Sequence, residues 1–100
     1  MQKFRTYNLA VSFYRQAAAL RLRSTVKDQL ERAALSIALN LAEGRGREST
    51  ADQKRFFRIA MGSLRECQAV FDIANLTNTE AGRILDELGG ALYRLIERAR

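Results

Sequence analysis

Residues 26–47 read VKDQLERAALSIALNLAEGRGR, and this stretch decides the fold because it forms a helix with two apolar faces. At 100° per residue, the first face contains Leu30, Ala34, Ile37 and Leu41. The second, on nearly the opposite side, contains Leu35, Leu39 and Ala42. A helix with two such faces is usually buried on both. We therefore expect one face to pack inside the protomer and the other against a second copy of the chain. The alternative is a helix packed deeply among its own neighbours.

Three more helical segments flank this one, with short joints and no Pro in the chain. The expected helices span about residues 8–22, 26–43, 51–75 and 80–98. Asn8 is a candidate N-cap, Thr50 with Gln53 and Thr77 with Glu80 have the form of capping boxes, and Gly44 is the expected end of the second helix. Four helices with short connections predict an all-α fold, an antiparallel up-down four-helix bundle forming a single domain over residues 1–100.

The third helix is expected to pack through one stripe of apolar side chains and one thiol. That stripe contains Phe56, Ile59, Ala60, Cys67, Val70, Phe71 and Ala74. Cys67 is expected to act there as a small hydrophobic residue rather than a reactive one. Gly62 and Ser63 lack bulk and would let a neighbouring backbone approach closely.

The composition excludes several classes of function. The chain has 100 residues, no His and one Cys, so it cannot form an internal disulfide or the usual zinc sites, and it lacks the commonest general base. We predict no metal, no cofactor, no small-molecule substrate and no catalysis. No apolar run is long enough to cross a membrane, and residues 1–5 lack the apolar core of a signal peptide, so the cytoplasm is the expected compartment.

The positive charge is concentrated and points to a polyanionic partner. Lys and Arg number 17 against 11 Asp and Glu, for a net charge of +6. Residues 1–27 contain no acid and these cations: Lys3, Arg5, Arg15, Arg21, Arg23 and Lys27. On the third helix Lys54, Arg58 and Arg65 form a straight stripe of roughly 16 Å. Arg binds phosphate through two parallel hydrogen bonds. The candidate nucleic-acid site comprises Arg15, Arg21, Arg23, Arg45, Arg47, Lys54, Arg58 and Arg65. The alternative is that these residues only solubilise the protein.

A polar strip of Ser36, Asn40 and Glu43 runs between the two apolar faces of the second helix. A shielded carboxylate needs a cation or several donors, which Arg47 or Arg55 could supply. A catalytic site would also need a nucleophile and a base in a concave site. We interpret the strip as a structural network that fixes helix register.

The segments SIALNLAEG (36–44) and GSLRE (62–66) resemble the bacterial "four helix bundle protein" family. That family is named for proteins encoded in intervening sequences of 23S ribosomal RNA genes and is also described as S23 ribosomal protein. The chain also looks related to the accessory variability determinant proteins of diversity-generating retroelements. The resemblance covers about residues 4–76. Ala38 stands where the family usually has Pro, so the second helix should be straighter, and the joint before it is shorter than usual.

The resemblance implies an antiparallel four-helix protomer, a ring-like homopentamer and no known catalysis. The retroelement relatives bind nucleic acid and partner a reverse transcriptase. We therefore expect a non-enzymatic, oligomeric accessory protein that binds RNA or DNA. The alternative is a structural or protein-binding scaffold whose basic surface docks an acidic protein. A neighbouring reverse transcriptase gene, or a location inside a ribosomal RNA gene, would distinguish the branches of the family.

Overall fold

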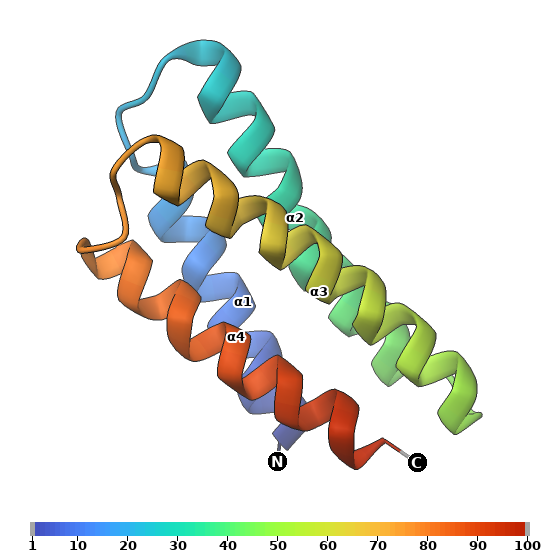
Figure 1. Ribbon diagram of the computed structural model, residues 1–100. Coiled ribbons are helices and arrows are strands. Elements are labelled where there is room, and N and C mark those ends of the chain that lie inside the picture. The colour runs from blue at the N-terminus through green and yellow to red at the C-terminus, as the bar shows by residue number, and fades with distance from the viewer. Residues whose placement is uncertain (1, 100) are drawn as a thin grey trace.

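Four helices follow one another in alternating directions in the computed structural model, which describes residues 2–99 and the side chains from Arg5 onward. They are α1 (Gln2–Ala18), α2 (Ser24–Arg45), α3 (Thr50–Ile73) and α4 (Glu80–Arg98). Each helix packs beside the next, and α4 returns to lie against α1 (Figure 1). No strand occurs within residues 2–99, so the predicted all-α bundle is confirmed. The molecule measures 40 × 21 × 18 Å. Assembly into a ring stays a prediction.

The first joint lies earlier than the sequence pattern indicates. α1 ends at Ala18 rather than near residue 22, and it begins well before Asn8, which lies inside the helix and is not its cap. The Lys27 ammonium donates hydrogen bonds to the Ala18 and Leu20 carbonyls, at 2.6 and 3.2 Å. The cation therefore satisfies the carbonyl of Ala18 at the end of α1 and that of Leu20 just beyond it, which stabilises the end of the helix there.

α2 is two residues longer at each end than expected and runs without interruption through Ala38. Gly44 does not end it. The helix continues to Arg45 with Gly46 as its C-cap, and Gly44 is buried instead. A Cβ at Gly44 would lie 2.7 Å from the Phe57 ring, so the glycine makes room for that ring.

The caps of α3 and α4 lie one and two residues away from the predicted capping boxes. The Ser49 hydroxyl, not that of Thr50, accepts the Asp52 amide at 3.1 Å. The Thr79 hydroxyl, not that of Thr77, accepts the Gly82 amide at 3.1 Å. These oxygens satisfy donors that every helix N-terminus leaves free. The bounds of α4 match the expected ones, whereas α3 ends at Ile73, short of residue 75.

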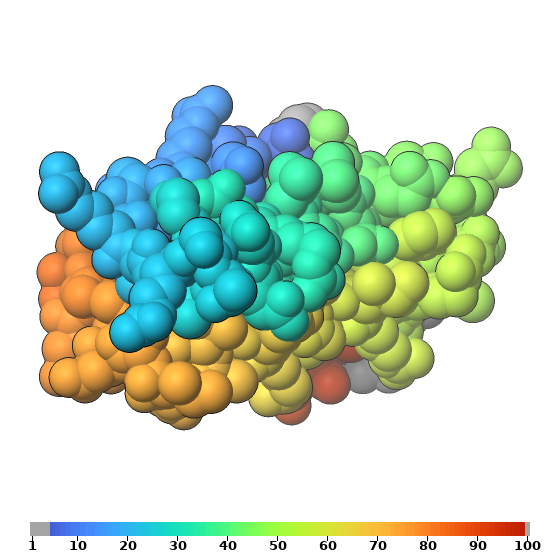
Figure 2. All heavy atoms as spheres, turned by 90° about the horizontal axis from the view of Figure 1, so that it is seen from above, coloured from blue at the N-terminus to red at the C-terminus, as the bar shows by residue number. Residues whose placement is uncertain are grey.

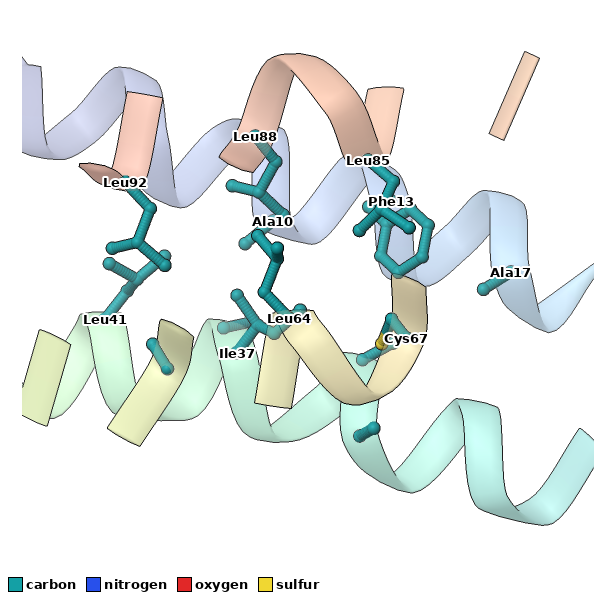
Figure 3. Packing of buried hydrophobic residues seen from close by; sticks show 14 of the residues in the cluster. Ala10, Phe13, Ala17, Ile37, Leu41, Leu64, Cys67, Leu85, Leu88 and Leu92 are labelled. Atoms are coloured by element: carbon teal, nitrogen blue, oxygen red, sulfur yellow. The ribbon is translucent and has the colours of Figure 1, made fainter. Parts of the chain in front are cut away.

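The core lies on the bundle axis and includes the first apolar face of α2. Leu30, Ala34, Ile37 and Leu41 are all buried, as predicted. Figure 3 shows Leu92 of α4 pointing toward Leu41 of α2. Phe13 and Phe71 meet with ring centroids 5.6 Å apart, so aromatic packing joins α1 to α3.

The buried face of α3 is rotated from the predicted one. Phe57 and Leu64 are buried, whereas Ile59 is 44% exposed and Phe56 is only partly covered. Ala60, Cys67 and Phe71 belong to both the predicted and the observed face and are buried. The rotation turns Ile59 outward, where it becomes part of the surface described below.

Candidate nucleic-acid interface

The basic stripe of Lys54, Arg58 and Arg65 lies on the outer side of α3. Both arginines are exposed and the lysine is partly exposed. Among the described residues, none of the three forms an ion pair. Their charges are therefore available to an anion from solvent. Asp72, further along the helix, is also exposed and has the opposite sign.

Arg45, the last residue of α2, and Arg47, in the α2–α3 joint, are both engaged within the protein. The Arg47 guanidinium lies 2.6 Å from the Glu43 carboxylate and 4.8 Å from the centroid of the Phe56 ring, and it approaches Asp52 at 4.0 Å. Arg45 lies over the Tyr7 ring at 5.8 Å. Through these contacts Arg47 links α2 to α3 across the joint between them. The Glu43 and Asp52 carboxylates largely offset its charge.

Some cations of the acid-free N-terminal stretch are paired with carboxylates from other parts of the chain, and others are not. Arg5 pairs with Glu87 at 2.9 Å and Lys27 pairs with Glu31 at 2.9 Å. The side chain of Lys3 lies outside the described part. The other cations are exposed and form no ion pair within residues 5–99: Arg15, Arg21 and Arg23. Arg21 and Arg23 lie in the α1–α2 joint, at the opposite end of the bundle from the α2–α3 joint that precedes Lys54 (Figure 1). The predicted residues therefore form separate groups.

The polar strip of α2 makes a small network that excludes one predicted member. The Asn40 amide donates to the Ser36 carbonyl and hydroxyl, at 2.9 and 3.1 Å. The Ser63 hydroxyl of α3 donates to the Ser36 hydroxyl at 2.8 Å. The sequence did not predict this contact, because it joins two helices; the only local signal was a small polar residue beside Gly62. Glu43 is not shielded: its side chain is 52% exposed. The network joins α2 to α3 through neutral groups, so it contains no general base.

The second apolar face of α2 lies on the surface. Leu35 and Leu39 are 43% and 59% exposed, and Ala42 is exposed as well. Ile59 of α3 lies one turn from Ser63, whose bond to Ser36 marks the seam between the two helices, so it adjoins the same face. Apart from its chain neighbours and the backbone of its own helix, no described atom lies within 4 Å of a Cβ placed on Gly62, so no neighbouring backbone approaches closely there within the protomer. Figure 2 looks onto α2, with α1 and α3 on either side.

Cys67 is buried in the core, as predicted. Burial raises the pKa of its thiol to about 12, and the nearby Glu66 carboxylate adds to the rise. The thiol therefore stays protonated at neutral pH and is a poor nucleophile. In the described part of the chain, no three His, Cys, Asp or Glu side chains gather where they could hold a metal ion. None of the described helices combines the length and the apolarity needed to span a membrane.

The fold and its surfaces define a small antiparallel four-helix bundle with an exposed cationic stripe and an exposed apolar face. The chain belongs to the 23S rRNA-intervening sequence protein family, whose model matches residues 3–97. The match agrees with the resemblance in the second and third helices and extends through α4. No curated protein and no solved structure matches the chain. The relation to retroelement proteins stays a prediction.

Proposed function

We propose that this protein is a non-enzymatic, oligomeric accessory protein that binds nucleic acid through the outer side of α3. The observation that carries the proposal is the unpaired basic stripe of Lys54, Arg58 and Arg65. Some other arginines have carboxylate partners, as Arg83 has in Glu80 at 2.8 Å. Arg15, Arg21 and Arg23 also form no ion pair within residues 5–99, but they lie outside α3. Exposed cations without such partners attract phosphates and release condensed counterions when they bind.

Assembly is the second part of the proposal. One stripe offers few phosphate contacts, and electrostatic binding by so few charges is weak at physiological salt. The apolar face of Leu35, Leu39 and Ala42, together with Ile59, supports contact with other copies of the chain. A ring, as the family resemblance implies, would present several stripes to one polymer and increase the apparent affinity. A reverse transcriptase partner is part of the same proposal only if the chain belongs to the retroelement branch.

The test is a titration of RNA, DNA and hybrid duplexes at two salt concentrations. The double variant Arg58→Glu and Arg65→Glu should bind all three more weakly and flatten the slope of log affinity against log salt. The matched control is Arg5→Glu with Arg15→Glu, which changes the net charge equally at exposed sites on α1. Its affinity should fall much less.

An acidic protein of similar net charge, used as a competitor, tests the alternative of a scaffold that docks acidic proteins. If that protein binds as tightly as RNA or DNA and the stripe variant loses both, the surface is a general anion-docking site. Equal nucleic-acid affinities for the stripe variant and the unmutated protein would show that the stripe is only solvated surface.

A further inference from the structure

Tyr93 of α4 presents an aromatic ring at the surface, outside the core. The Tyr93 side chain is 58% exposed, and it makes no hydrogen bond or ring contact within the described residues. Leu92 and Leu95, its neighbours on the helix, are buried. An exposed aromatic side chain adds nothing to core packing. The position of Tyr93 relative to the charged surfaces therefore indicates what its ring could bind.

Two contacts give the register between α3 and α4. Asp72 and Gln68 of α3 line one surface pocket together with Asp86 of α4. One turn further along α4, a Cβ on Gly89 would lie 3.6 Å from Leu64 and 3.7 Å from Gln68. The two helices therefore face each other through these flanks.

This register places Tyr93 beside the basic stripe. The helices are antiparallel, and seven residues make about two turns, which returns to the same side of a helix. Seven residues beyond Asp86 on α4 is Tyr93, and seven residues before Asp72 on α3 is Arg65. By this register Tyr93 lies on the flank of α4 that faces α3, at the level of Arg65, the last cation of the stripe.

We propose that the surface made by the basic stripe and Tyr93 binds single-stranded nucleic acid, with phosphates on Lys54, Arg58 and Arg65 and a base stacked on Tyr93. The inference rests on the proposed nucleic-acid binding and names its substrate class. A base in a duplex is already stacked on its neighbours, so only an unpaired strand can offer one to the ring. The carboxylates of Asp72 and Asp86, which line the neighbouring pocket, repel phosphate and limit the strand to the side of Tyr93 where Lys54 lies.

The experiment compares three probes of equal length: a single-stranded oligonucleotide, the duplex, and an abasic single strand that keeps the phosphates. Tyr93→Leu removes the aromatic face but keeps an apolar side chain, and Tyr93→Phe is the control that keeps the ring. Tyr93→Leu should weaken binding of the single strand about 5- to 100-fold. Tyr93→Phe should bind it like the unmutated protein. Neither variant should change the affinity for the abasic strand or the duplex.

The outcomes separate this inference from the proposed function. If Tyr93→Leu binds the single strand unchanged while reversal of Arg58 and Arg65 weakens binding, the stacking role is overturned and nucleic-acid binding stands. If Tyr93→Leu weakens binding of all three probes alike, the ring acts through assembly or protein contacts, and the single-strand assignment is also overturned. If the unmutated protein binds none of the probes, both proposals fail.

Discussion

Gly82 and Gly89 occupy the same helix, and their surroundings predict opposite effects of adding a methyl group. A Cβ on Gly82 would overlap the Thr77 carbonyl oxygen, a backbone atom that cannot turn aside. Gly82→Ala should therefore lower the free energy of unfolding by about 1–3 kcal/mol. Gly89→Ala meets only ordinary contacts and should raise it by up to about 1 kcal/mol, because Ala favours the helix. Urea unfolding followed by circular dichroism measures both, and shifts in the same direction would contradict the account.

Cys67 predicts how stability depends on pH in alkaline solution. The pKa of its thiol is raised by burial from an ordinary value of 9.0 to about 12 in the folded protein. Between these values the unfolded chain loses the proton while the folded chain keeps it. Stability is therefore unaffected by this group below pH 9 and falls as the pH rises toward 12, by at most about 1.4 kcal/mol per pH unit. Cys67→Ala should reduce that slope; an identical slope in both proteins would exclude the thiol as its source.

At the scale of the helix, α3 shows what its sequence can and cannot predict. The adjacent rings of Phe56 and Phe57 allow two phases of the apolar stripe, and both phases share Ala60 and Cys67. Local periodicity does not choose between them, because the choice depends on the facing helix. The Phe57 ring packs against Gly44, where there is no side chain, and the guanidinium of Arg47 lies over the Phe56 ring. Neither contact is visible from the spacing of residues in α3.

The two phenylalanines give a direct test of that phase. Phe57 is fully buried, so Phe57→Ala should cost about 3–5 kcal/mol of unfolding free energy. Phe56 is partly exposed and lies 4.4 Å from Arg55 in a cation–π contact, so Phe56→Ala should cost about 1–2 kcal/mol. Equilibrium unfolding of the two variants decides the matter. A larger loss for Phe56→Ala would restore the phase predicted from sequence.

Helix ends were harder to predict than helix existence for a similar reason. Capping oxygens at Ser49 and Thr79 lie within two residues of other hydroxyls that satisfy the same sequence rule. Which hydroxyl caps the helix depends on where the chain turns, and Lys27 shows that a residue of the following helix can set that point. The bounds of α4 nevertheless agreed with the expected residues 80–98.

At the scale of the whole molecule, the sequence determines which residues form the core of the protomer. It does not determine what binds to an exposed apolar face. The sequence correctly separated the two faces of α2, because their spacing is a local property. The buried face packs inside the protomer, whereas Leu35 and Leu39 are exposed on its surface. Likewise, helical spacing predicted that Arg58 and Arg65 share one side of α3, but it could not place Tyr93 at their level, because the register of α4 against α3 is set only when the chain folds.

The last prediction joins assembly to binding. Leu39 is 59% exposed in the protomer, so Leu39→Glu should leave the fold intact but place an unpaired charge in an apolar contact between copies. Light scattering should then give a smaller mass for the variant than for the unmutated protein.

A strand of about 10 nucleotides engages one stripe, so both proteins should bind it equally. A strand several times longer reaches neighbouring stripes, and linked sites can raise affinity by about 10²- to 10⁴-fold. That gain with length should be lost in Leu39→Glu, whereas reversal of Arg58 and Arg65 should weaken binding at both lengths. A mass near 11.3 kDa for the unmutated protein, or an equal gain with length in Leu39→Glu, would contradict a role for assembly.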